Sequence, residues 1–335
     1  MFVRSRFLLR TTPLWAVALV LCASASAQAQ KQLRWKFKAG DKIRYNVSSK
    51  TVIDNKGEMP FKMTQTQTFD STIDAESVDA DGTAAIKQTV DRLQIKMDGP
   101  FGNNVIDSDS EEKPEGFAAA IADGAKAIAK QPVSLKANAR GEVSDITLTD
   151  EMSKKLEELS AAGGAFGGGM NADAVKQLVK QPWTVLPEKA VNVGDKWEET
   201  NEMASGPLGK MKLVTSYEYA GSEKHDGIPC EKITMTMTQE VVPDENAQFK
   251  VEIKNQENTG TLFFDAASGR VVSAEMESKV QMALDFNGNK IESNTTATTT
   301  QKLVVGGAKP KATKPTTLKK EDPKKTKTPD KEGDK

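Results

Sequence analysis

Apolar and polar residues alternate along most of the chain. Between residues 233 and 238, Ile and Met alternate with Thr, and the same period of two recurs at residues 93–97 and 280–286. A period of two buries one face of a strand and leaves the other in water. Because the polar positions are mostly Thr, Gln, Lys and Glu, the pattern favours antiparallel sheets with one solvated face over parallel sheets buried on both sides.

Short turns containing Gly separate these predicted strands, and the order of features occurs twice. Ala39-Gly40-Asp41-Lys42 and Val193-Gly194-Asp195-Lys196 each precede long predicted strands. An Asp-Gly turn follows in both cases, at residues 81–82 and 226–227, and then a strand pair around a Gly turn, at residues 140–141 and 268–269. We interpret this recurrence as two related β units. The alternative is a chance recurrence of common turn residues.

Three amphipathic helices are predicted in the middle of the chain. The first has an apolar face from Phe117 to Ile128 and ends before Pro132. The second begins after Thr149, a good N-cap, and ends at the Gly pair 163–164. The third runs from about residue 171 to residue 180. Their apolar stripes need a partner, and the apolar faces of the sheets are the obvious one.

Together these patterns predict an α+β fold that is mostly antiparallel β. Two long-stranded β units would form a half-barrel or one continuous curved sheet, with three short helices inserted between them. The expected divisions are a signal peptide at 1–29, a first β unit at 30–150, a helical insert with a Gly-rich loop at 151–182, a second β unit at 183–305 and a disordered Lys/Pro-rich tail at 306–335.

The beginning of the chain predicts export. Three arginines precede an apolar run from Leu14 to Ala23, and Ala27-Gln28-Ala29 then supplies the small-x-small pattern of a cleavage site. The apolar run is too short to span a bilayer. We therefore expect a mature protein that begins near Gln30 and resides in the periplasm or outside the cell.

The chain has two cysteines. Cys22 lies in the predicted signal peptide, and an acylated lipoprotein is a rival interpretation. Leu21 argues against it, because a small residue normally precedes an acylated cysteine. Cys230 is then the one thiol of the mature chain, so no intrachain disulfide can form. We expect Cys230 to be a small buried apolar residue.

A net charge of −1 hides an acidic body and a basic tail. Residues 306–335 hold ten lysines against five acidic residues, and their largest apolar side chain is Leu318. Such a segment buries too little surface to offset its ordering entropy. The alternative to a solvated tail is an electrostatic tether to an anionic surface. The tail has no aromatic residue to stack on bases, which argues against specific nucleic-acid binding.

Between the second and third predicted helices the sequence reads GGAFGGGM, residues 163–170. Five glycines in eight residues leave this segment without a local conformational preference. It is either a linker or a mobile flap that carries Phe166 and Met170 over the mouth of a cavity. Those two residues are the candidate ligand-binding residues.

The sequence offers little catalytic chemistry. His225 is the one histidine and is expected in an exposed turn; with one cysteine it cannot form the usual zinc site. Neither a nucleophile elbow nor a phosphate-binding Gly loop is present. The acidic run of Asp107, Asp109, Glu111 and Glu112 is better explained as a solvated loop than as a Ca²⁺ site. We expect no enzyme, no cofactor and no metal, and we expect Trp35, Trp183 and Trp197 to anchor the core.

The segments LRWKFKAGDKIRYNV and LPEKAVNVGDKWEE resemble an uncharacterised, domain-of-unknown-function family of exported bacterial β-rich proteins. The matching residues of the second segment are Leu186, Pro187, Val193, Gly194, Asp195, Lys196 and Trp197. The order of long strands with inserted helices is also similar to LolA/LolB-type half-barrel carriers, at the level of fold alone. That likeness implies an apolar cavity but no activity.

Three functions from different classes remain open. The first is an exported binding protein of the cell envelope that holds a lipid or lipoprotein between sheet and helices. The second is a structural envelope protein tethered by its basic tail. The third is a hydrolase with a carboxylate pair, which would need two acidic side chains facing each other in a concave pocket.

Overall fold

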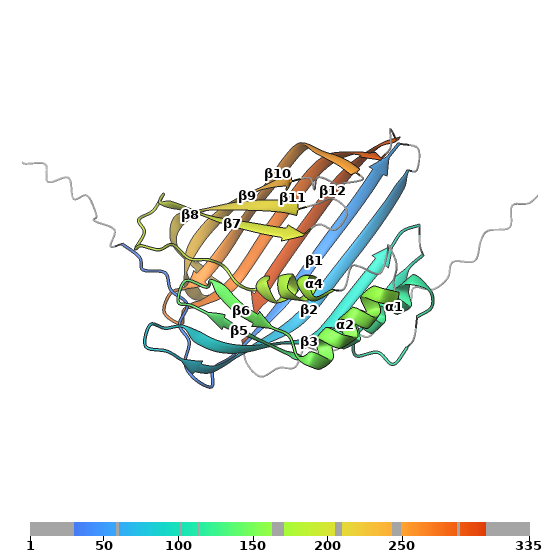
Figure 1. The fold of residues 1–335 in the computed structure, drawn as a ribbon. Helices are drawn as coiled ribbons and strands as arrows, with labels where there is room; N and C mark the ends of the chain where they lie inside the picture. The colour runs from blue at the N-terminus through green and yellow to red at the C-terminus, as the bar shows by residue number, and fades with distance from the viewer. Residues whose placement is uncertain are drawn as a thin grey trace, which may run out of the picture.

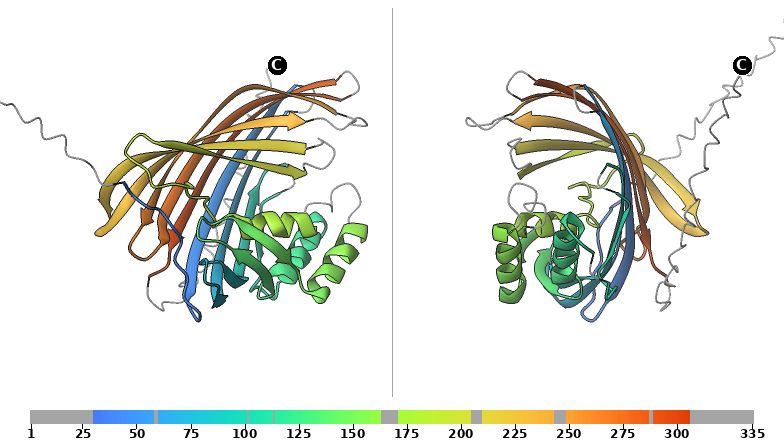
Figure 2. Two further views of the ribbon diagram at one scale, coloured as in Figure 1. Left: turned by 60° about the vertical axis from the view of Figure 1, so that its left-hand side comes forward. Right: turned by 90° about the vertical axis from the view of Figure 1, so that its right-hand side faces the viewer.

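The computed structural model describes residues 30–57, 60–100, 102–112, 114–162, 171–204, 210–242, 249–286 and 289–305. These residues form one antiparallel sheet of twelve strands, with the helices on its concave side (Figures 1 and 2). The predicted α+β fold is confirmed, and the two predicted β units share one continuous curved sheet.

The elements have the following bounds: β1 (Lys42–Lys56), β2 (Phe61–Val78), β3 (Ala84–Asp98), β4 (Asn104–Asp107), α1 (Phe117–Ile128), β5 (Pro132–Ala137), β6 (Val143–Thr147), α2 (Asp150–Ala162), α4 (Ala172–Lys180), β7 (Lys196–Ala204), β8 (Lys210–His225), β9 (Ile228–Val242), β10 (Phe249–Asp265), β11 (Arg270–Phe286) and β12 (Asn289–Leu303).

The last strand lies in the middle of the sheet. The strand order is β6-β5-β3-β2-β1-β12-β11-β10-β9-β8-β7, and β4 pairs with β3 beside this path. β12 pairs with β1 from Tyr45 opposite Leu303 to Lys56 opposite Glu292, and with β11 on its other side. It therefore joins two five-strand halves that follow the same order across the sheet.

A Gly-Asp corner begins the first half. Gly40 N donates to the carbonyl of Ala75 at 2.7 Å, and Ala75 N donates back to the carbonyl of Asp41 at 2.9 Å. The Asp41 carboxylate closes the turn by accepting from Lys38 N at 3.2 Å. Gly40 has a φ of 85°, in the left-handed region that favours glycine.

The second half begins with the same corner. Gly194 N donates to the carbonyl of Tyr219 at 2.8 Å, and Tyr219 N donates to the carbonyl of Asp195 at 3.0 Å. Asp195 Oδ2 accepts from Asn192 N at 2.7 Å, and Gly194 has a φ of 92°. The shared bond pattern supports the interpretation of two related units, whose boundaries stay a prediction.

The three predicted helices are confirmed. Thr149 Oγ1 accepts from Met152 N at 3.2 Å at the start of α2, and Asn171 Oδ1 accepts from Ala174 N at 2.9 Å at the start of α4. α1 lies between β4 and β5, inside the first half, so among the described residues α2 and α4 are the helices that lie between the halves.

The core lies between the concave face and the elements packed on it. Trp35 is 2% exposed, and its ring is 5.1 Å from Trp183 and 6.1 Å from Phe37 and Phe264, measured between centroids. Trp197 stacks on Tyr217 at 5.3 Å. The three tryptophans are core anchors, as the sequence predicted.

Candidate ligand-binding cavity

Residues 181–187, which we call the crossing segment, follow α4 and are held by both halves of the sheet. Trp183 Nε1 donates to Gln88 Oε1 on β3 at 2.9 Å, and Gln301 Nε2 on β12 donates to the carbonyl of Pro182 at 3.0 Å. Gln88 and Gln301 are both buried. These side chains position the first part of the segment over the concave face.

Three more hydrogen bonds fix the rest of the crossing segment. Trp35 Nε1 donates to the carbonyl of Thr184 at 3.0 Å, and Trp197 Nε1 donates to the carbonyl of Val185 at 2.9 Å. Leu186 N donates to the carbonyl of Arg140 at 2.8 Å. The indole N–H groups of Trp35, Trp183 and Trp197 therefore all make hydrogen bonds that fix the position of this segment.

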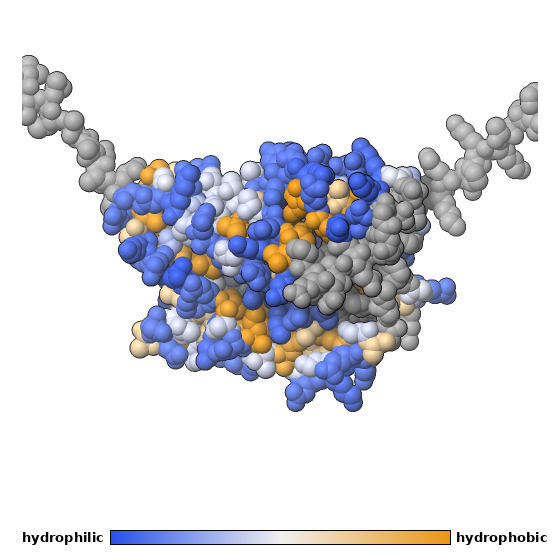
Figure 3. All heavy atoms as spheres, turned by 45° about the horizontal axis from the view of Figure 1, so that its top comes forward, coloured by the Kyte–Doolittle hydropathy of each residue, from blue (hydrophilic) through white to orange (hydrophobic). Residues whose placement is uncertain are grey.

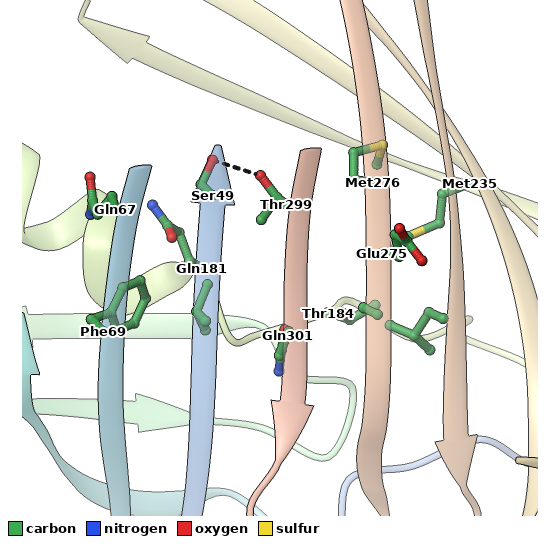
Figure 4. A pocket seen from close by; sticks show the side chains of 13 residues that line it. Ser49, Gln67, Phe69, Gln181, Thr184, Met235, Glu275, Met276, Thr299 and Gln301 are labelled. Carbon is green, nitrogen blue, oxygen red and sulfur yellow. Dashed lines mark hydrogen bonds between the residues drawn. The ribbon is translucent and has the colours of Figure 1, made fainter. Parts of the chain in front are cut away.

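A cavity of about 350 Å³ lies between the crossing segment and the middle of the sheet (Figure 4). The surface seen in Figure 3 is largely hydrophilic, with apolar patches toward its centre. The cavity is lined by residues of β1, β2, β9, β10, β11, β12 and the crossing segment: Val47, Ser49, Gln67, Phe69, Gln181, Thr184, Met235, Leu262, Ala274, Glu275, Met276, Thr299 and Gln301.

The sheet contributes two rows of cross-strand neighbours to the cavity wall. Strand register gives the deeper row as Phe69, Val47, Gln301, Ala274 and Leu262. The second row reads Gln67, Ser49, Thr299, Met276, Gly260 and Met235. Directly opposite residues share a face of a sheet, so both rows face the concave side.

The second row divides the cavity into a polar and an apolar half (Figure 4). On β1, β2 and β12 it carries hydroxyls and an amide, and Ser49 Oγ lies 3.0 Å from Thr299 Oγ1. On β9 and β11 it carries Met235 and Met276, beside Leu262 of the deeper row. In the second row, polar and apolar groups therefore lie on opposite sides of the cavity, whereas the deeper row carries the apolar Phe69 and Val47 below the polar side.

Gly260 allows two methionines to lie close against β10. A Cβ at this position would lie 2.6 Å from the carbonyl oxygen of Glu275 and 2.9 Å from the terminal methyl of Met235. The position between Met276 and Met235 therefore excludes any side chain, because the Met235 methyl and the Met276 sulfur, at 2.9 and 3.2 Å from that Cβ, already occupy the space over Gly260.

The candidate ligand-binding residues selected from the sequence stay a prediction. Phe166 and Met170 lie outside the described residues, and the cavity wall consists of residues that sequence reasoning did not select. The sequence feature that could have indicated this cavity lies in β12, where residues 292–301 read ESNTTATTTQ. A strand that is polar on both faces yet central in a sheet indicates a concave face with polar groups in its middle.

His225 corrects an expectation from the sequence. It was predicted in an exposed turn, but it ends β8 and is half-buried, with its ring stacked on Phe263 at 3.9 Å between centroids. Its Nε2 lies 2.8 Å from Ser273 Oγ. Ser273 precedes Ala274 on β11, so alternation places it on the face opposite the cavity. The turn itself is formed by Asp226 and Gly227, both with positive φ.

The acidic run is also only partly a solvated loop. Arg92 binds Asp107 through two hydrogen bonds, Nε to Oδ1 at 3.0 Å and Nη2 to Oδ2 at 2.5 Å. Burial works to raise the pKa of Asp107, but the bonds from Arg92, Asp109 N and Gln94 outweigh it and lower the pKa to about 2. Within the described ranges, no three His, Cys, Asp or Glu side chains gather closely enough to hold a metal ion.

Cys230 is buried, as expected, with a pKa that burial raises. In the part of the chain that the structure covers, no helix has both the length and the apolar character needed to cross a membrane.

Comparison with solved structures finds distant likenesses. Lipovitellin, in a structure that concerns its lipid–protein interactions, matches with 13% identity and a TM-score of 0.42, over 80% of this chain and 25% of its own. A Bacteroides fragilis protein with a YmcC-like fold matches with 8% identity and a TM-score of 0.28, over 80% and 98% of the two chains. The chain thus spans a quarter of the lipovitellin chain, and scores this low carry no argument about function.

Comparison with curated proteins found no match. The model of a family of unknown function, DUF6263, matches residues 81–306. This match covers more than half of the chain and confirms the expected membership of a domain-of-unknown-function family: the protein belongs to the DUF6263 family.

Proposed function

We propose that the protein is an exported, non-catalytic binding protein of the bacterial cell envelope that holds an apolar ligand, such as a lipid, between its sheet and the crossing segment. The observation that carries this proposal is the cavity of about 350 Å³, lined by Phe69, Leu262 and Met276 among others. Binding sites for small molecules are concave, partly apolar spaces of roughly 300–1,000 Å³.

The cavity wall has the properties that favour an apolar guest. Each methylene group that a ligand buries contributes about 0.8 kcal/mol. Met235 and Met276 have flexible, polarisable side chains that adapt to ligands of different shape. The crossing segment is already fixed by its hydrogen bonds with Gln88, Gln301 and Trp35, so little ordering cost remains for binding.

The lining also supports a non-catalytic role. Glu275 is the one ionisable residue among the described residues that line the cavity, and its side chain is exposed. Its neighbours Ala274 and Met276 face the cavity, so alternation directs the Glu275 carboxylate to the opposite face. These lining residues do not supply the facing carboxylates that a glycosidase-type mechanism needs. His225 and Ser273 are a hydrogen-bonded pair on the face opposite the cavity.

Native mass spectrometry of the mature protein, gently purified from its own envelope and then extracted for lipids, tests this function. Ala274→Phe should fill the cavity, and Glu277→Phe is the matched control because Glu277 is exposed on the other face of β11. We expect a stoichiometric apolar molecule in the wild type and the control and its loss in Ala274→Phe. A bare wild-type protein, or a ligand retained by Ala274→Phe, would refute the proposal.

The second candidate is a packed structural protein of the envelope, favoured by the ten lysines of residues 306–335. It predicts that deletion of residues 306–335 releases the protein from the insoluble envelope fraction, while the wild type carries no bound molecule. Unchanged partitioning of the deletion variant would rule out the tether.

A further inference from the structure

The described side chains that face the cavity carry no charge. Apart from Glu275, which alternation directs to the opposite face, the lining consists of apolar residues, hydroxyls and amides. An ionised group taken into such a space without an opposite charge loses hydration that nothing replaces, which is costly. The wall therefore discriminates against a ligand whose charge must enter the cavity.

The polar half has hydrogen-bonding capacity to offer. Among the described residues, the side-chain amides of Gln67 and Gln181 make no hydrogen bond. Gln67 is half-buried on β2, whereas Gln181 is exposed at the start of the crossing segment. Gln301 uses its Nε2 to bind the carbonyl of Pro182 and has its Oε1 left to accept. A primary amide both donates and accepts, so it matches hydroxyl and amide groups of a ligand.

The apolar half supplies the complementary surface for a hydrocarbon chain. Met276, Met235 and Leu262 lie on three neighbouring strands, and the two methionine side chains cover Gly260 between them. A ligand that spans the cavity therefore meets amides and hydroxyls at one end and an alkyl-lined space at the other.

We propose that the ligand of this cavity is a non-ionic amphiphile, with a hydroxyl- or amide-bearing head against Gln67 and Gln181 and an alkyl chain against Met235, Leu262 and Met276. This inference rests on the proposed function and specifies its ligand class. The protein selects the head group because the amides are free to bind and no described side chain facing the cavity can neutralise a charge.

Three probes with the same twelve-carbon chain length and different heads test the selection: monolauroylglycerol, laurate and lauryltrimethylammonium. Their affinities for the full mature chain are measured by displacement of a solvatochromic fluorophore, below the micellar concentration of each. We expect monolauroylglycerol to bind at least about tenfold more tightly than either charged probe, which corresponds to ~1.4 kcal/mol.

Variants locate the selection at the two amides. The double change Gln67→Leu and Gln181→Leu should reduce the preference for the neutral head to less than about threefold. Gln67→Lys should shift the preference to laurate by supplying a counter-charge. Gln281→Leu is the matched control, since Gln281 is exposed on the other face of β11, and it should keep the wild-type preference. Circular dichroism confirms that each variant is folded.

The outcomes separate the two proposals. If none of the three probes binds to the wild type, the proposed function itself fails. If the probes bind equally, or a charged probe binds more tightly than monolauroylglycerol, the binding function stands and the head-group inference is overturned. A neutral preference that survives the double leucine change also overturns the assignment to Gln67 and Gln181.

Discussion

Replacing Trp183 with Phe tests how strongly the hydrogen bond between Trp183 and Gln88 holds the crossing segment in place. The change keeps an aromatic ring but removes the N–H that donates to Gln88 Oε1 at 2.9 Å. Gln88 is fully buried, and its Nε2 already donates to Ser71 Oγ at 3.3 Å. Its carbonyl would thus lose its donor in a place that water does not reach, at a cost of about 1–3 kcal/mol. Weaker contacts with the ring of Trp35, now 5.1 Å away, bring the expected loss to about 2–4 kcal/mol.

A double-mutant cycle isolates the hydrogen bond from the packing. Gln88→Leu removes the acceptor, so the variant with both changes has no orphaned carbonyl beside the smaller ring. The free energies of unfolding, measured by urea titration with circular dichroism, should show a coupling of at least ~1 kcal/mol. Gln281→Leu, at an exposed site, should change stability by less than about 0.5 kcal/mol. Additive effects in the cycle, or a loss below about 0.5 kcal/mol for Trp183→Phe, would refute this reasoning.

Three further predictions concern sites away from the cavity. The pKa of Asp107 is lowered in the folded state, so its pairing with Arg92 should contribute about 1–2 kcal/mol of stability above pH ~4, and this contribution is lost as the pH falls toward 2. Asp107→Asn should therefore reduce the loss of stability at acid pH, measured as the free energy of unfolding against pH. An unchanged loss at acid pH would contradict the pairing. Gly194→Ala should lower the free energy of unfolding by about 1 kcal/mol from backbone strain alone, because the φ of Gly194 is 92° and nothing lies within 4 Å of the new Cβ. Gly141→Ala should lower it far more, because the new Cβ would overlap the carbonyl oxygen of Thr184. Equal unfolding midpoints for the two variants would contradict this comparison. Cys230 should react with a thiol reagent only after unfolding in urea, and rapid labelling of the native protein would show that it is not buried.

Local patterns were sufficient to predict the elements of this fold. The alternation around residues 233–238 and 280–286 indicated strands, and Thr149 marked the start of α2 through its side-chain cap. These signals depend on neighbours within a few residues, so they can be read directly. The single continuous sheet was only one of two predicted options, because the joining of the two halves depends on which distant strands pair and in which order.

The cavity could not be predicted in the same way. Its wall joins residues as distant in sequence as Val47, Met235 and Thr299, and only the pairing of β1, β12, β11, β10 and β9 in that order brings them together. The close packing of Met235 and Met276 over β10 depends on Gly260, which sequence alone offers as an ordinary strand residue. Likewise, His225 is half-buried because Phe263, from another strand, stacks on it.

The central position of β12 constrains the order in which the strands of this protein can pair during synthesis and folding. Tyr45 on β1 pairs with Leu303 on β12. β1 leaves the ribosome long before β12, so the backbone N–H and C=O groups along one edge of β1 stay unpaired until β12 has been synthesised. A growing chain can assemble β1 to β6 and β7 to β11 separately, but each partial sheet then exposes a long unpaired strand, β1 in one and β11 in the other. Joining them is a late step with a large loop-closure cost, and slow folding follows from such distant contacts. A chain that stops before β12 is therefore left with two half-sheets whose open edges can pair with other chains, and truncation there should cause aggregation instead of yielding a smaller stable domain.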